Sequence, residues 1–201
     1  MKDRSPVPEV MTMRMNLPNR LTLLRIALVP VFVAFALLGI ESGIKACSLV
    51  AAAVFAVASL TDMLDGHIAR SRNLITDFGK LMDPLADKML TTAAYVCMVL
   101  AGACHPVALI LILSREFAVS GIRMLAASSG DRTVVPANVW GKAKTVLMMV
   151  GIIAFYSASG FLPGDARVLL ASNVLCWICA VLAIVSGITY FVSLKHLLKD
   201  M

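Results

Sequence analysis

The stretch TDMLDGHIARSRNLITDFGKLMDPLADK, residues 61–88, places five acidic residues between the end of one apolar segment and the start of the next. Asp62 and Asp65 are three residues apart in its first half. Asp83 and Asp87 are four apart in its second half, so each pair shares one face of a helix. Two antiparallel neighbouring helices joined by a turn would set these pairs opposite each other. Four converging carboxylates require cations, because acidic groups beside long apolar segments are costly unless they are paired, hydrated or metal-bound.

Apolar segments flank this stretch and fill most of the chain. Hydrophobic residues make up 60% of the 201 residues, which exceeds the share in a typical soluble domain. A helix that crosses a bilayer needs about 20 predominantly apolar residues. The sequence therefore predicts an all-α, polytopic membrane protein with six transmembrane helices, at residues 21–40, 46–64, 85–102, 106–127, 145–156 and 168–194. The fifth reaches a spanning length only if it starts near Val139 or continues past Ser157.

The polar residues 1–15 are expected to form a short cytoplasmic leader, and residues 16–201 a single six-helix catalytic domain in the membrane. A cleaved signal peptide is the alternative, since Arg20 and Arg25 precede the first apolar run. The five spans that follow favour a first helix that is not removed.

The five cysteines lie within or beside apolar spans, so they are expected to be small buried hydrophobic residues. Cys176 and Cys179 have the C-x-x-C spacing. No second pair or nearby histidine supports a zinc site there. The packing interpretation is therefore favoured over metal binding.

The formal net charge of +6 is explained by membrane topology and does not require a nucleic-acid partner. Six spans place most basic residues on one side of the bundle, and only Lys45 and Arg167 clearly on the other. The side rich in lysine and arginine faces the cytoplasm in membrane proteins. Both termini and the two longer polar connections are therefore expected to be cytoplasmic, and no nucleic acid is expected as a partner.

The acidic cluster offers only oxygen ligands, which favour hard cations such as Mg²⁺ or Mn²⁺. Such ions retain water and bind substrate phosphates, so the cluster indicates phosphoryl chemistry. Gly66 and Gly79 lie close to the acids, where a missing side chain lets a ligand or the partner helix approach the backbone. Arg70 is suited to bidentate phosphate binding, with a topological anchor at the membrane edge as the alternative.

The pattern Asp62-x-x-Asp65-Gly66-x-x-Ala69-Arg70, followed after eight residues by Gly79-x-x-x-Asp83-x-x-x-Asp87, resembles the signature of the CDP-alcohol phosphotransferases. The resemblance implies a six-helix fold in the bacterial inner membrane, usually a homodimer, with a two-metal site at the cytoplasmic interface. It implies Mg²⁺ or Mn²⁺ as the two cations. The implied metal ligands are Asp62, Asp65, Asp83 and Asp87, with Asp87 also the general base. The implied contacts to the CDP-lipid are Asn19, Thr22, Gly66, Arg70 and Thr76.

The segment around Asn19 resembles the entry to the first helix in bacterial phosphatidylglycerophosphate synthases, a branch of this family. The alternative is a plain helix start with Asn19 as the cap and Arg20 and Arg25 as membrane anchors.

The fourth predicted span contains SREFAVSGIR, residues 114–123, in which Arg115 and Glu116 lie deep in a hydrophobic stretch. Glu116, Ser120 and Arg123 are spaced by four and three, so they form one polar stripe that is expected to face the bundle interior. A structural pair between Arg115 and Glu116 is the alternative. Neighbouring residues on a helix do not face each other, so both are expected to need other partners.

This segment, together with Gly-Lys-Ala-Lys-Thr at residues 141–145, is also similar to bacterial phosphatidylglycerophosphate synthases. The similarity implies that Arg115, Arg123 and Lys144 hold the acceptor's phosphate, with Lys142 as an interfacial anchor. The implied reaction transfers the phosphatidyl group of CDP-diacylglycerol to sn-glycerol 3-phosphate and releases CMP. Cardiolipin synthase and phosphatidylinositol-phosphate synthase are alternatives within the superfamily. An ion transporter is the alternative from another class, since intramembrane charges also mark ion pathways.

Overall fold

The computed structural model describes the backbone of residues 17–71, 77–128 and 139–194, and side chains within 21–61, 85–86, 88–121 and 140–189. The described part of the chain is helical and contains no β-strand. Its helices are α1 (Leu17–Glu41), α2 (Lys45–Ser71), α3 (Asp77–Leu100), α4 (Pro106–Ser128), α5 (Val139–Phe161) and α6 (Ala166–Leu194). The predicted all-α fold of six helices is confirmed. Residues 1–15 lie outside the described residues, so the expected division into leader and domain stays a prediction.

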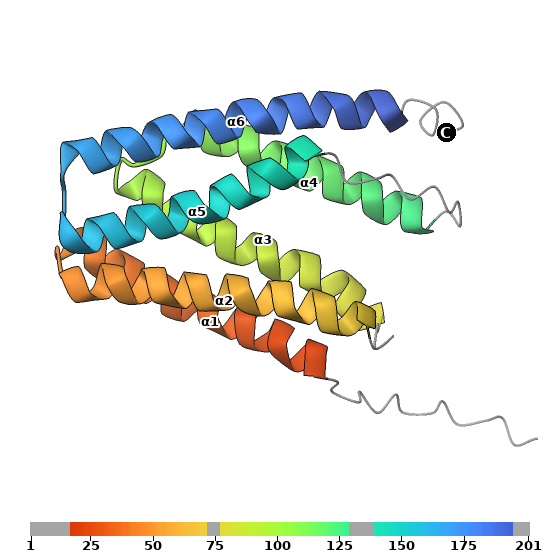
Figure 1. Cartoon of the computed structure of the whole chain (residues 1–201), viewed down its shortest axis with the longest axis horizontal. Coiled ribbons are helices and arrows are strands. Elements are labelled where there is room, and N and C mark those ends of the chain that lie inside the picture. Colours follow the sequence, from red (N-terminus) through yellow and green to blue (C-terminus); the bar gives the residue numbers. More distant parts are fainter. Residues whose placement is uncertain (1–16, 72–76, 129–138, 195–201) are drawn as a thin grey trace, which may run out of the picture.

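Successive helices run in opposite directions along one long axis (Figure 1). The start of α1 and the end of α6 therefore lie at the same end of the bundle, together with the end of α2 and the start of α3. At the opposite end, three short connections join the helices. Each contains a glycine at positive φ, namely Gly43 (65°), Gly102 (74°) and Gly164 (72°). That backbone conformation favours glycine, which has no side chain to clash.

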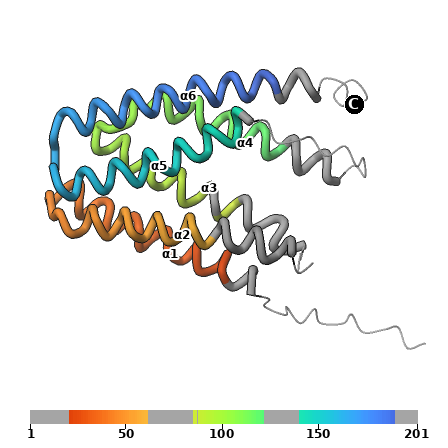
Figure 2. Tube along the Cα trace, viewed as in Figure 1, coloured from red at the N-terminus to blue at the C-terminus, as the bar shows by residue number. Residues whose placement is uncertain are grey.

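The helices contact one another in the series α3, α1, α2, α5, α6, α4, which we call the packing series. Figure 2 shows the trace of α5 running between α2 and α6, the two helices that it contacts most. Helices α3 and α4 are consecutive in the chain but stand at the two ends of this series. In the described part of the chain they touch each other only sparsely. The bundle is therefore an open ring that closes loosely between α3 and α4.

The core is made of small and aromatic residues, which bring the helices close together. Phe32, Phe55 and Tyr156 are fully buried, and the ring of Phe32 lies 5.9 Å from that of Phe55 and 5.2 Å from that of Tyr156. The Tyr156 hydroxyl donates a hydrogen bond to the Ala94 carbonyl at 3.1 Å, which satisfies its polar end and joins α5 to α3. Leucine, isoleucine and valine side chains are exposed around the outside. An apolar outer surface is what a lipid environment requires.

Three described segments are long and apolar enough to cross a membrane: Leu21–Glu41, Trp140–Phe161 and Ala166–Thr189. Lys45–Thr61 and Lys88–Leu100 are shorter apolar segments. The fifth predicted span, residues 145–156, proves too short, since α5 runs over Val139–Phe161. Either a start near Val139 or a continuation past Ser157 was required, and α5 has both, which brings it to a spanning length.

Candidate functional site

The four aspartates of the acidic cluster occupy the parts of two helices that lie at the same end of the bundle. Asp62 and Asp65 belong to the last turns of α2, and Asp83 and Asp87 to the first turns of α3. The two helices are antiparallel, as predicted, but in the part of the chain that the structure describes their direct contact is slight. Helix α1 packs against both.

The side chains of these aspartates lie outside the described residues, so their metal-binding roles and the role of Asp87 as base stay predictions. Within the described side chains, no group of three or more histidine, cysteine or acidic residues is arranged to hold a metal ion.

The residues predicted to contact the CDP-lipid belong to α1, α2 and the connection after α2. Helix α1 begins at Leu17, so Asn19 lies inside its first turn and does not precede the helix as a cap would. Thr22, on the same helix, is 1% exposed and engaged in contacts inside the bundle. Gly66 and Arg70 belong to α2, and the Arg70 side chain lies outside the described side chains. Thr76 lies outside the described residues.

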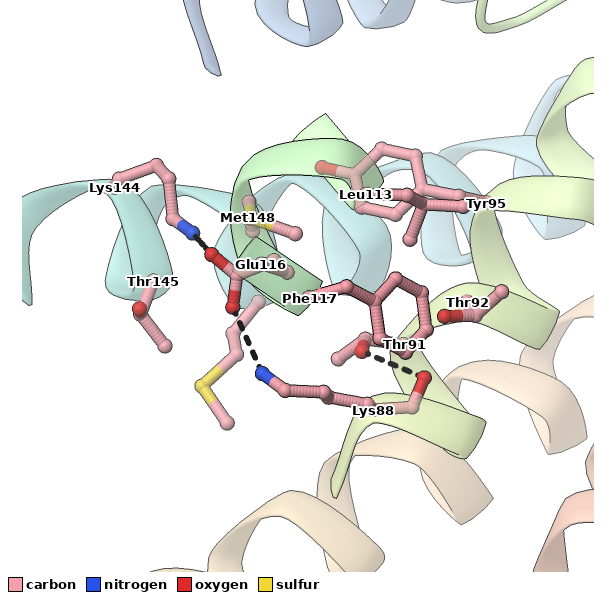
Figure 3. A pocket seen from close by; sticks show the side chains of 11 residues that line it. Lys88, Thr91, Thr92, Tyr95, Leu113, Glu116, Phe117, Lys144, Thr145 and Met148 are labelled. Carbon is pink, nitrogen blue, oxygen red and sulfur yellow. Dashed lines mark hydrogen bonds and ion pairs between the residues drawn. The ribbon is translucent and has the colours of Figure 1, made fainter. Parts of the chain in front are cut away.

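A single carboxylate, that of Glu116 on α4, gathers three cations from three helices. Its Oε2 accepts a hydrogen bond from Lys88 Nζ of α3 at 3.2 Å. Its Oε1 accepts one from Arg115 Nη1 at 2.9 Å and another from Lys144 Nζ of α5. In Figure 3 the Glu116 carboxylate lies between the two lysine ammonium groups. We call Lys88, Arg115, Glu116 and Lys144 the charge cluster.

The charge cluster lies largely out of contact with solvent. The Lys144 side chain is 1% exposed, Arg115 13%, Lys88 16% and Glu116 20%. Charges at such depth carry a desolvation cost of several kcal/mol each and persist where counter-charges offset it. Three cations and one carboxylate leave the cluster with two positive charges in excess. This excess suits the binding of an anion.

Arg115 takes part in the cluster from the other side of α4. Its Nη2 donates a hydrogen bond to the Ser186 hydroxyl of α6. Gly141 and Gly187 make room for it, since a β-carbon at either position would lie 3.3 Å from the Arg115 side chain. The expectation that Arg115 and Glu116 do not face each other is therefore wrong in part. The arginine side chain is long enough to reach the neighbouring carboxylate, although both residues also have the partners on other helices that the sequence required.

A cavity with a volume of about 20 Å³ lies between α3, α4 and α5. Its charged lining is Lys88, Glu116 and Lys144, and the remainder comes from threonine, aromatic and aliphatic side chains. A second cavity of about 480 Å³ lies between α4 and α6 and is lined by Arg115 with mostly apolar neighbours. Lys88 and Lys144 line the first of these cavities and Arg115 the second, although Arg115 and Lys144 donate to the same oxygen of Glu116.

Three residues were predicted to bind the acceptor, and the structure brings two of them, Arg115 and Lys144, together at Glu116. The side chain of Arg123, also on α4, lies outside the described residues. Lys144 is buried and Lys142 is exposed, so only one of these two lysines points into the bundle. Their phosphate-binding role stays a prediction.

Lys88 is the member of the charge cluster that the sequence interpretation missed. It follows Asp87 directly, and a lysine inside a predicted span is itself a signal of a buried partner. The partner is Glu116, which is 28 residues away in the chain. No spacing rule within one helix connects them.

Comparison with known proteins gives a consistent result. A model of the CDP-alcohol phosphatidyltransferase family matches residues 15–185. A Bacillus subtilis protein named CDP-diacylglycerol–glycerol-3-phosphate 3-phosphatidyltransferase is 39% identical over 184 residues, covering 88% of this chain and 93% of the relative. A Haemophilus influenzae protein of the same name is 32% identical over 191 residues, covering 94% and 98%. A Mycobacterium tuberculosis protein named probable phosphatidylglycerophosphate synthase is 37% identical over 176 residues, covering 87% and 79%.

Proposed function

Because this chain belongs to the CDP-alcohol phosphatidyltransferase family, we propose that it transfers the phosphatidyl group of CDP-diacylglycerol to sn-glycerol 3-phosphate and releases CMP. The observation that carries the proposal is the match, over most of both chains, to relatives whose names specify this donor and this acceptor. The buried excess of positive charge supports it, since this acceptor carries a negatively charged phosphate.

The donor set of the acidic cluster fits a pair of divalent cations. Asp62, Asp65, Asp83 and Asp87 supply oxygen ligands from two helix segments at one end of the bundle, and carboxylate oxygen suits Mg²⁺ or Mn²⁺. We propose that these residues hold two such ions. When bound, the ions neutralise the negative charge of the pyrophosphate in the CDP-lipid.

The protein's own residues then orient the two substrates. Asn19, Thr22, Gly66, Arg70 and Thr76 are proposed to bind the CDP moiety. Asp87 takes the proton from the acceptor hydroxyl as general base. The hydroxyl oxygen attacks the lipid-linked phosphorus in line, the bond to the CMP oxygen breaks, and CMP leaves. Catalysis comes mainly from positioning and electrostatic stabilisation.

The location follows from the same proposal. The protein is a membrane protein, and we propose that it resides in the bacterial inner membrane as a homodimer. The end of the bundle that carries the acidic cluster then faces the cytoplasm, where the soluble acceptor is present and where the basic residues of that end are favoured.

Acceptor specificity tests the proposal directly. Purified protein in mixed micelles with labelled CDP-diacylglycerol is given sn-glycerol 3-phosphate, phosphatidylglycerol or inositol phosphate, and CMP release is measured. We expect release with glycerol 3-phosphate alone, loss of activity with a chelator, and recovery with Mg²⁺ or Mn²⁺. Release only with phosphatidylglycerol would indicate a cardiolipin synthase. Release only with inositol phosphate would indicate a phosphatidylinositol-phosphate synthase.

Substitution of the proposed base separates an enzyme from a transporter. Asp87→Asn should abolish CMP release while leaving the folded protein in the membrane, with size-exclusion behaviour in detergent as the check on folding. Transfer that persists in this variant would refute the assignment of Asp87 as base.

A further inference from the structure

We propose that Lys88 and Lys144 together bind the acceptor's phosphate, that Glu116 holds these two lysines in position, and that Arg115 positions Glu116 without touching the acceptor. This inference rests on the proposed function and revises its acceptor site. Lys88 enters the site, and Arg115 changes from a ligand of the phosphate to a positioning residue.

The two lysines converge on one small volume from different helices. Lys88 reaches Glu116 Oε2 from α3, and Lys144 reaches Oε1 from α5. Both line the cavity between α3, α4 and α5, and their ammonium groups lie on either side of the carboxylate (Figure 3). A tetrahedral phosphate that enters this cavity meets two ammonium donors on separate helices. Charge-assisted hydrogen bonds of this kind are shorter and stronger than neutral ones.

The charges of the cluster match a phosphate monoester. The charge cluster contains three cations and one carboxylate, so its net charge is +2. A phosphate monoester carries about −1.5 to −2 charges at pH 7. Binding of this group therefore brings the buried site close to neutrality, which offsets the desolvation cost of the cations.

Arg115 is held away from this cavity. One nitrogen of its guanidinium donates to Glu116 and another to Ser186 of α6. The residue lines the other cavity, between α4 and α6, whose walls are otherwise almost wholly apolar. Its guanidinium thus contacts the same carboxylate oxygen as Lys144 does, while Lys88 and Lys144 line the cavity between α3, α4 and α5 and Arg115 does not.

Lys88 also belongs to the same turn of α3 as Asp87, the residue proposed to take the acceptor's proton.

In the structure the cavity volume of about 20 Å³ is enough for one water molecule. The phosphate must therefore displace part of what fills the site. Glu116 already supplies two carboxylate oxygens to the lysines, in the way that phosphate oxygens would. We expect the entering phosphate to take over the Lys88 contact, because Lys88 is the more exposed of the two lysines, and the sparse contact between α3 and α4 allows the cavity to widen.

Steady-state kinetics of Lys88 variants test this inference. Lys88→Met should raise the KM for glycerol 3-phosphate by about 10- to 100-fold, the loss expected for a hydrogen bond to a charged group. The KM for CDP-diacylglycerol should stay unchanged, and Lys88→Arg should recover most of the loss. Inorganic phosphate should inhibit the wild-type protein competitively with glycerol 3-phosphate and inhibit the Lys88→Met protein far less.

Matched variants separate this role from a structural one. Lys142→Met removes an exposed lysine two residues from Lys144 and should leave both KM values unchanged. Ser186→Ala releases the Arg115 guanidinium and should raise the KM for glycerol 3-phosphate far less than Lys88→Met does, because both lysines remain in place. A rise as large as that in Lys88→Met would instead place Arg115 on the acceptor.

Labelling of the wild-type protein gives a second measurement that needs no variant. Inorganic phosphate should slow the reaction of Lys88 with an amine reagent, as followed by mass spectrometry, and leave the rate at Lys142 unchanged. Wild-type activity with an unchanged KM in Lys88→Met, or equal labelling rates with and without phosphate, would overturn the inference. No CMP release from the wild type with glycerol 3-phosphate would refute the proposed function itself.

Discussion

Glu116 is the residue that makes the polar interior of this membrane protein tolerable. It contacts one cation on each of two other helices and a third on its own helix. Lys144 depends on it most, because this lysine is 1% exposed and has almost no access to water. A buried pair need not stabilise a fold relative to apolar residues of the same size, but loss of one partner leaves an uncompensated charge.

Removal of this carboxylate should therefore destabilise the bundle strongly. We expect Glu116→Ala to lower the free energy of unfolding by about 3–5 kcal/mol, measured by denaturant unfolding in detergent micelles. The double variant Glu116→Met with Lys144→Met should recover part of this loss, since it also removes the most deeply buried of the three cations that Glu116 pairs with. A loss below about 0.5 kcal/mol in Glu116→Ala, typical of an exposed position, would contradict the dependence of Lys144 on Glu116.

The charge cluster also shows how far the sequence reaches at the scale of single residues. The stripe of Glu116, Ser120 and Arg123 was predicted to face the interior, because charges deep in apolar spans need partners, and the family resemblance implied Arg115 and Lys144 as contacts of the acceptor. Lys88 was not predicted to face the interior, because its partner lies on another helix. The spacing of residues within one helix does not show which helices pack together. The four aspartates were identified from their clustering beside apolar segments, their spacing and the family resemblance, and their side-chain geometry stays a prediction.

At the scale of elements, α5 shows where the sequence interpretation stopped short. The expected span began at Thr145, with a start near Val139 as one of the two extensions that would bring it to a spanning length. The helix begins at Val139, since Lys144 is paired inside the bundle and only Lys142 is exposed. Hydropathy alone cannot distinguish a lysine that ends a span from one that is neutralised within it.

Close approach between helices depends on glycines at particular positions. A β-carbon at Gly39 on α1 would lie 2.9 Å from the backbone nitrogen of Ser48 and 3.2 Å from its Cα on α2. Backbone atoms cannot move aside as the end of a side chain can. Small residues of this kind are enriched where membrane helices touch, because there the association rests on packing.

The prediction for this contact has a matched control within the chain. Gly39→Ala should lower the free energy of unfolding by about 1–3 kcal/mol, the usual cost of overpacking. Gly121→Ala on α4 should leave it equal or raise it by up to about 1 kcal/mol, because nothing lies within 4 Å of the added carbon and alanine favours the helix. Both values come from unfolding in the same detergent, and equal effects of the two changes would contradict the close contact of α1 with α2.

At the scale of the whole molecule, the alternating helices divide the chain into two chemically different ends. One end carries the acidic cluster and the starts of α1, α3 and α5. The other carries three short glycine-containing turns and the basic residues Lys45 and Arg167. The sequence predicted this division from the distribution of basic residues, and the backbone confirms which helix ends lie together.

Orientation in the membrane follows from the proposed cytoplasmic site and is testable by labelling. In a protein with Cys47 replaced by serine, Ser42→Cys and Leu162→Cys should react with an impermeant thiol reagent added to intact spheroplasts. Lys142→Cys should react only after the membrane is permeabilised. The opposite pattern would reverse the proposed topology.

The open packing series has a consequence for how the bundle deforms. Within the described residues, α3 and α4 contact each other far less than the other neighbouring helices of the packing series do, so the bundle can open between them with the least loss of packing. The Lys88 to Glu116 ion pair connects these two helices. An anion that binds Lys88 in place of Glu116 therefore breaks this connection. Binding of the anion and separation of α3 from α4 then favour each other.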